Sequence, residues 1–398
     1  MRNRSPIAGA ALAVVGLALG GRAAPAEPLP EPPPPRIEPG HMPQPESKDE
    51  RGLWMEMADF EKQLATSPML VRDPEINNFV RDVFCRVAGD YCHDVRIYIV
   101  RNPGFNASMA PNGMMMIWTG VFMRVRDEDE LAVVLGHELA HFLRTHSLLA
   151  WRKAKREMAA GSILSLAIGV ATGVLLPVGE SLALLSSLSF SREHEREADL
   201  LGTKLLVDGG FDPHAAYQVW ESLVEEERRA VAKSEEPGIF SQTHPEPLER
   251  AQELKRYVDD RYGPATERTA AEVDYLAGLG RHYEVLMEDQ LDTNRYGRTE
   301  FLLERHAAMG LDPALVDFYR GEMYRQRGGE GDAEAAREAY LHATAHEHPY
   351  PPAFRNLGYL ALKSGDSGSA RSYFEQYLAL APEADDREMI KFYLEDLP

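Results

Sequence analysis

The sequence predicts a mainly α-helical protein with one small β-sheet, followed by a region of helical repeats. Three observations support this expectation. Apolar residues recur at helical spacing through most of the chain, often between residues that cap helices. Between residues 95 and 118, an alternating apolar segment and an Asn-Gly turn predict strands. After residue 311, small and aromatic residues recur at the spacing of a paired-helix repeat.

The composition allows more than one domain and disfavours two classes of partner. The chain has 398 residues, of which 44% are hydrophobic, so a full core is possible. The formal net charge is -20, and no basic run follows the N-terminus. Nucleic acid and an anionic membrane surface are therefore not expected as electrostatic partners.

Residues 1–26 have the pattern of a signal peptide. Two arginines precede the apolar run from Ile7 to Leu19, and Ala24 to Ala26 offers small residues for cleavage. A retained membrane anchor is the alternative. The proline-rich linker over residues 27–50 is expected to be extended and to pack no core.

The only two cysteines are Cys85 and Cys92. Export implies an oxidising compartment, which favours a disulfide between them over two free thiols. No second cysteine pair accompanies them, so a structural zinc site is not expected there.

A globular domain is expected over residues 51–258. It begins with helices over 53–64 and 74–87, and residues 95–100 alternate as a strand does.

An Asn-Gly turn predicts a hairpin, and its second arm is short and apolar. This arm is either a sheet edge that binds an extended peptide or an internal strand without a ligand, and both interpretations stay open. The candidate substrate-binding residues are Asn112, Gly113, Met114, Met115 and Met116.

The sequence His137-Glu138-Leu139-Ala140-His141 lies in an apolar run that predicts a helix. Residues four apart share a helix face, so both imidazoles can converge on one zinc ion. Glu138 then lies beside the metal, where it can take a proton from bound water. A chance pair of histidines on a core helix is the alternative. The helix is expected to continue past His146 into the basic stretch Arg152 to Arg156.

Residues 158–190 are almost uncharged and contain several glycines and a proline. A single membrane crossing would separate the histidines from any metal ligand after residue 190, and two crossings need more residues. A broken helical hairpin that covers the site or touches a membrane surface is therefore favoured over a span.

Three glutamates at the start of the next helix compete as the third ligand: Glu193, Glu195 and Glu197. Glu195 is favoured because Asp199 follows it on the same face. Asp199 can accept the spare N–H of a zinc-bound histidine and fix its tautomer. A solvated charged helix is the alternative.

His244, between Thr243 and Pro245, and Arg250 form a further candidate pair. They can stabilise an anionic intermediate, or His244 can block the open metal position at rest. The same residues also fit a simple helix start.

Residues 259–310 are expected to form a helical connector and residues 311–398 tetratricopeptide-like repeats. A generic helical bundle is the alternative. A stack of repeats suggests a protein partner, because it forms a concave surface. The repeat positions are Phe354, Leu357, Gly358, Ala370, Phe374 and Pro382, with a looser copy at Gly321, Tyr324, Ala336, Tyr340 and Ala343.

As an ordered set over about residues 70 to 255, these motifs resemble the HtpX and CAAX-prenyl-protease type of zinc metallopeptidase, a gluzincin family. The export signal and the repeats make the chain more similar to the periplasmic, BepA-like branch. The resemblance implies a zincin-like domain with one zinc ion on His137, His141 and Glu195. It also implies Glu138 as the base, with His244 and Arg250 in transition-state stabilisation or gating.

The expected function is therefore that of a zinc endopeptidase in the periplasm of a Gram-negative bacterium, soluble or membrane-associated. Its expected substrates are unfolded or misassembled envelope proteins, and outer-membrane assembly machinery is the possible partner of the repeats. Two rivals remain: a chaperone or assembly factor with a latent zinc site, and a membrane-embedded prenyl-protein protease.

Overall fold

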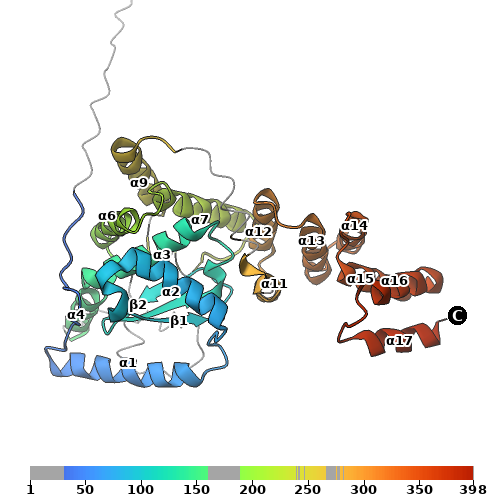
Figure 1. Ribbon diagram of the computed structural model, residues 1–398, viewed down its shortest axis with the longest axis horizontal. Coiled ribbons are helices and arrows are strands. Elements are labelled where there is room, and N and C mark those ends of the chain that lie inside the picture. Colours follow the sequence, from blue (N-terminus) through green and yellow to red (C-terminus); the bar gives the residue numbers. More distant parts are fainter. Residues whose placement is uncertain are drawn as a thin grey trace, which may run out of the picture. The chain divides into compact units, whose positions relative to one another are not determined.

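The structure is a computed structural model that describes residues 31–159, 189–238, 240, 243–245, 247–265, 275, 278–280 and 282–397 (Figure 1). As expected, these ranges are mainly helical with one small sheet. The signal segment 1–26 and most of the apolar stretch 158–190 lie outside the described residues. Within the described ranges, no helix combines the length and apolar character that crossing a membrane requires.

The elements up to residue 262 include the three-stranded sheet. In chain order they are α1 (Lys48–Thr66), α2 (Pro74–Ala88), η1 (Gly89–Asp94), β1 (Arg96–Val100), β2 (Ala107–Met109), β3 (Met114–Trp118), η2 (Thr119–Val121), α3 (Glu128–Leu143), α4 (His146–Ala159), α6 (Arg192–Asp208), α7 (Ala215–Ala232) and α9 (Pro247–Tyr262). The helical part that follows contains α11 (His282–Asp292), α12 (Tyr296–Ala308), α13 (Pro313–Arg327), α14 (Asp332–Ala345), α15 (Pro351–Lys363), α16 (Ser367–Leu380) and α17 (Arg387–Asp396).

Strand β3 is the middle strand of the sheet, so the interpretation of residues 112–116 as a substrate-binding edge is wrong. The order is β1-β3-β2, with β3 parallel to β1 and antiparallel to β2. Met114, Met116 and Trp118 pack in one cluster with residues of α1 and α4, and the alternating residues of β3 are also buried. The apolar run therefore reflects burial on both faces rather than an exposed edge.

The hairpin itself forms as predicted between β2 and β3. The Ala110 N–H donates to the Met114 carbonyl at 2.8 Å. Gly113 has a φ of 81°, a left-handed conformation that glycine adopts without a Cβ penalty. Asn112 Oδ1 accepts from the Met114 N–H at 3.1 Å, which fixes the turn locally.

Helix α3 ends at Leu143, so the expected continuation past His146 is wrong. Asp127 caps its start by accepting from the Glu130 N–H at 2.9 Å. Thr145 then adopts a φ of 60°, and α4 begins at His146. The chain turns at this point, and the turn keeps His146 beside the end of α3.

The proline-rich segment is not free of the core, contrary to expectation. Ile37 is buried, and its carbonyl accepts from the Tyr91 hydroxyl at 2.9 Å. The Arg36 N–H donates to the Leu143 carbonyl at 2.8 Å, and Arg144 donates to the Pro34 carbonyl at 2.7 Å. This segment therefore packs at the C-terminal end of α3.

Cys85 and Cys92 form the predicted disulfide. The bond joins the last turn of α2 to η1, just before β1. The Arg81 guanidinium supports the same turn, since it donates to the Val95 carbonyl at 3.0 Å.

Two successive helix pairs in the C-terminal region are built around the same glycine–aromatic contact. In α13 and α14, a Cβ on Gly321 would overlap the Tyr340 ring. In α15 and α16, a Cβ on Gly358 would overlap the Phe374 ring. The predicted helical region is confirmed, and its assignment to tetratricopeptide repeats stays a prediction.

Candidate metal centre

Helix α3 brings the two motif histidines together on one buried face. The Nε2 atoms of His137 and His141 lie 3.1 Å apart, and both side chains are almost fully buried. Four residues make slightly more than one helical turn, so the two rings project to the same side of the helix.

Helix α6 approaches α3 closely enough to deliver the third ligand candidate. Gly136 and Gly202 form the crossing, where a Cβ on Gly202 would lie 3.2 Å from the His137 Cα. The Glu195 carboxylate oxygens then lie 3.6 Å from His137 Nε2 and 3.5 Å from His141 Nε2. By contrast, Glu193 is exposed. The close crossing therefore brings Glu195, the favoured glutamate, to the histidines.

His244 completes a cluster of four side chains. Its Nδ1 lies 3.2 Å from each Glu195 oxygen and 3.4 Å from His137 Nε2. The potential ligand atoms of His137, His141, Glu195 and His244 all lie within 4.8 Å of one another, and all four residues are buried.

The hydrogen-bond partners of the two motif histidines fix their tautomers. His137 Nδ1 lies 3.0 Å from the Asp199 carboxylate. An ionised carboxylate can only accept hydrogen bonds, so Nδ1 carries the proton. His141 Nδ1 faces His146 Nδ1 at 3.1 Å. The other nitrogen of His146 faces Glu197 at 3.0 Å and carries its proton, so His146 Nδ1 accepts from His141. Burial lowers the pKa of His146 to about 4, so this ring is neutral near pH 7.

Both Nε2 atoms of the motif histidines are consequently lone-pair donors that face each other. With Glu195, three electron-donating groups converge on one buried point without a proton between the two imidazoles. Such an arrangement is unfavourable unless a cation lies among them. Two neutral imidazoles and a carboxylate form a donor set that fits one zinc ion.

Arg250 holds two carboxylates of the site rather than facing an open position. It donates to the two oxygens of Asp199 at 2.8 and 2.7 Å and pairs with Glu195 at 2.6 Å. Burial opposes ionisation of Asp199, but Arg250 and His137 together hold the Asp199 pKa well below its usual value. Arg250 therefore fixes the geometry of Asp199 and Glu195, and its expected role in transition-state stabilisation or gating stays a prediction.

Glu138 lies beside the cluster, as the motif predicts. It is buried, and its Oε1 lies 3.7 Å from His244 Nε2. Burial raises the pKa of Glu138 to about 7. A carboxylate with this pKa can take up and release a proton near neutral pH.

Sequence reasoning missed the residues that surround the cluster. Glu197, one of the two other ligand candidates, accepts from both His146 and Arg144. The predicted continuous helix concealed the role of His146, because only the turn at Thr145 brings its ring to His141. Three aromatic rings also surround the cluster, and no spacing pattern in the sequence indicated them. Measured between ring centroids, Phe190 stacks on His141 at 4.0 Å, Trp220 contacts His137 at 5.4 Å, and Phe240 stacks on His244 at 4.2 Å.

Comparison with known proteins identifies relatives of this arrangement. Residues 71–258 match the family described as Peptidase family M48. The beta-barrel assembly-enhancing protease of Yersinia pestis is 28% identical over 240 residues, which cover 56% of this chain and 46% of the relative. The Escherichia coli (strain K12) protein of the same name is 27% identical over 211 residues, 50% of this chain and 42% of the relative.

A mitochondrial protein is also similar. The mitochondrial metalloendopeptidase OMA1 of Schizosaccharomyces pombe is 31% identical over 167 residues, which cover 41% of this chain and 47% of the relative. The chain spans about half the length of the curated relatives it matches.

Proposed function

We propose that this chain is an exported zinc endopeptidase of the bacterial envelope, on the premise that its residues 71–258 match peptidase family M48. The observation that carries the proposal is the convergence of two neutral imidazoles and a carboxylate, with Glu138 buried beside them. An ionisable carboxyl next to a metal donor set is the arrangement required for metal-assisted peptide hydrolysis.

In the proposed mechanism, His137, His141 and Glu195 hold the zinc ion. When bound, zinc acts as a Lewis acid toward water and the scissile carbonyl. Glu138 accepts the proton of the attacking water and passes it to the leaving amine, for which a pKa near neutrality is suited. Asp199 and His146 keep the histidine protons on the nitrogens that face away from the metal.

His244 supplies a regulatory step in this proposal. Its Nδ1 shares the space of the three ligands, so the cluster holds four donors. If all four residues held the metal, protein donors alone would complete its usual set of ligands. The imidazole must therefore move away before catalysis, and the described arrangement corresponds to a resting enzyme.

The proposed substrates are unfolded or misassembled outer-membrane proteins in the periplasm. The names of two relatives refer to β-barrel assembly. The export signal and the Cys85–Cys92 disulfide both fit an oxidising compartment. In this proposal the helix pairs α13–α14 and α15–α16 hold an assembly partner, as tetratricopeptide repeats do.

The test of the catalytic step is Glu138→Gln in the full chain. We expect this variant to keep its zinc and to lose cleavage of an unfolded model protein, because glutamine cannot accept the proton. Glu193→Gln, which changes an exposed glutamate on α6, is the matched control and should cleave normally. Cleavage by the Glu138→Gln protein at the parental rate would refute the mechanism.

A chaperone or assembly factor with a latent zinc site is the second candidate function. The position of His244 among the possible metal ligands favours it, because a fourth protein ligand would exclude water from the metal. The Glu138→Gln variant separates the two functions in cells that lack the parental protein. Full restoration of envelope assembly by this variant would support the chaperone, whereas failure would support the peptidase.

A further inference from the structure

A cavity of about 350 Å³ lies where the peptidase part meets the first helices of the helical part. Its volume falls within the usual range of ligand pockets. Three arginines and two glutamates line it, which gives a local excess of one positive charge in a protein of net charge -20. Its uncharged lining includes Asn102, Phe105, Trp118, Phe240, Gln290 and Thr293.

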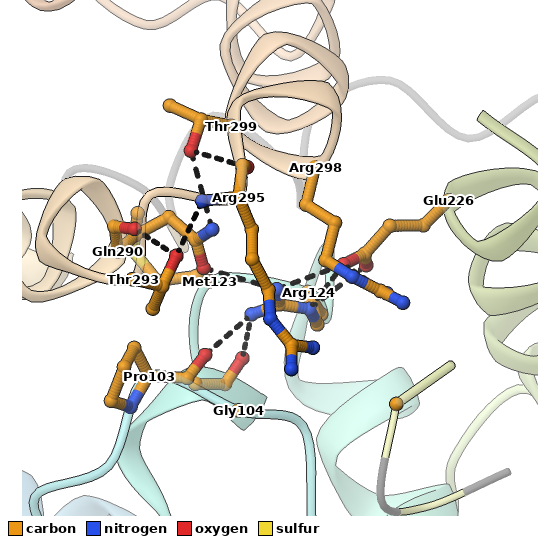
Figure 2. Close-up of polar contacts among 12 residues, drawn as sticks. Pro103, Gly104, Met123, Arg124, Glu226, Gln290, Thr293, Arg295, Arg298 and Thr299 are labelled. Atoms are coloured by element: carbon orange, nitrogen blue, oxygen red, sulfur yellow. Dashed lines mark hydrogen bonds and ion pairs between the residues drawn. The ribbon is translucent and has the colours of Figure 1, made fainter. Parts of the chain in front are cut away.

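Two of the three arginines are paired with glutamates of the protein (Figure 2). Arg124 donates to Glu226 at 2.8 Å and to Gln290 at 3.1 Å, and its remaining N–H groups reach the carbonyls of Pro103 and Gly120. Arg298 donates to Glu226 at 3.2 Å and to Glu227 at 2.8 Å. Because each charge here has an opposite partner, Arg124 and Arg298 fix the wall of the cavity and have no free charge for a ligand.

Arg295 differs from both. Its backbone N–H and carbonyl contact Thr293 and Thr299, but no side chain or carbonyl of the described residues pairs with its guanidinium. Figure 2 likewise draws no contact to that guanidinium. A partly buried guanidinium that no described residue engages is well suited to hold a carboxylate by two parallel hydrogen bonds.

The wall of the cavity also contains aromatic residues, beside the polar Asn102, Gln290 and Thr293. Phe105, Trp118 and Phe240 are buried residues of its wall, and the rings of Phe105 and Phe240 meet edge to face at 5.0 Å. An apolar group that enters the cavity therefore replaces water against aromatic carbon.

We propose that this cavity binds an apolar residue that carries a carboxylate on a polypeptide, with Arg295 as the carboxylate receptor. The ligand class follows from a guanidinium without a partner among the described residues, which lies beside aromatic walls. That the ligand is a polypeptide rests on the proposed peptidase function. The carboxylate comes either from the C-terminus of the polypeptide or from an acidic residue next to an apolar one.

The cavity is connected to the metal cluster through Phe240. The Phe240 ring stacks on the His244 ring with 4.2 Å between the ring centroids and an interplanar angle of 13°. The backbone carbonyl of Phe240 accepts from the backbone N–H of His244 at 2.8 Å. The same ring stacks on Trp220 at 5.3 Å. A ligand that displaces Phe240 must also disturb His244, so binding in the cavity favours release of the fourth donor.

The binding test uses a short fluorescent peptide that ends in phenylalanine and the zinc-loaded, full-length Glu138→Gln protein. We expect saturable binding by fluorescence anisotropy, and C-terminal amidation should weaken it about tenfold or more. Arg295→Gln should weaken binding of the acid by a similar factor and should abolish the difference between acid and amide. Arg295→Lys should restore part of the preference.

The matched control is Arg228→Gln, which removes the same charge from an exposed position on α7, where Arg228 pairs with Glu225. This variant should bind the peptide as the parent does. A peptide with an internal Asp-Phe pair and an amidated end identifies the source: tight binding points to an acidic side chain, and weak binding to the terminal carboxylate. Equal binding of acid and amide, or an unchanged acid preference in Arg295→Gln, would overturn the proposal.

The coupling to the cluster has a separate readout. Saturating peptide should increase the rate at which a chelator removes zinc, because His244 no longer closes the donor set, and Arg295→Gln should lose this effect. An unchanged removal rate at full occupancy would refute the coupling. Neither readout requires turnover, so a loss of binding and a loss of cleavage are separate results.

Discussion

The two buried charge networks of this protein show how similar side chains serve different purposes. Arg124, Glu226 and Arg298 form the network between α7, α11 and α12, and each charge has an opposite partner within hydrogen-bond distance. In the cluster of α3 and α6, Arg250 satisfies the outer carboxylates, but two imidazole lone pairs and Glu195 still face one another. The charges of the first network balance one another and join parts of the fold. The second group of side chains lacks a positive charge between its electron-donating atoms and therefore requires a cation.

Glu226→Gln should give the largest change in stability. The substitution leaves two buried arginines without their shared carboxylate, which typically costs about 3–5 kcal/mol. The free energy of unfolding from denaturant titration measures this loss, and zinc content should stay parental because the network lies outside the metal cluster. A stability loss below about 1 kcal/mol would show that the network is not closed in solution.

Asp199→Asn tests the outer part of the metal cluster. Asparagine can still accept from His137 Nδ1, but it lacks the charge that opposes Arg250, so zinc affinity should fall about 10–100-fold. Competition with a chelator measures this affinity. Asp208→Asn, on an exposed part of the same helix, is the control and should bind zinc as the parent does. Equal affinities in both variants would refute the role of Asp199.

Lowering the pH should weaken the contribution of Glu226 to the free energy of unfolding. Burial opposes its ionisation, but Arg124 and Arg298 lower the Glu226 pKa below its usual value of 4.5. A lowered folded-state pKa stabilises the protein above pH 4.5, and this contribution is lost as the pH falls through the lowered value. The difference in melting temperature between parent and Glu226→Gln should therefore shrink between pH 7 and pH 3. A constant difference would contradict this assignment.

The two networks also differ in how much of them could be predicted from the sequence. His137 and His141 were predictable because helical spacing alone puts them on one face, and Asp199 follows Glu195 by the same rule. Glu226 is 102 residues from Arg124, so only the tertiary fold brings them together. No local periodicity identifies such a pair, and the same limit applies to Phe240 beside His244.

Local signals also failed where one pattern fits two structures. The apolar residues Met114 to Trp118 fit an edge strand and a central strand equally well, and tertiary pairing decides for the central position. The residues after His141 fit a continuous helix, but Thr145 adopts a left-handed conformation without the glycine that usually signals it. The helical C-terminal region was predictable because its glycine–aromatic contacts recur within each helix pair.

The zinc content of the purified full-length protein tests most directly whether His137, His141 and Glu195 bind one zinc ion. Metal analysis should find one zinc ion per molecule in the parent and in Glu193→Ala, and much less in Glu195→Ala, because of the three candidate glutamates only Glu195 reaches both histidines. Full zinc content in the Glu195→Ala protein would contradict the assignment of this carboxylate as the third ligand.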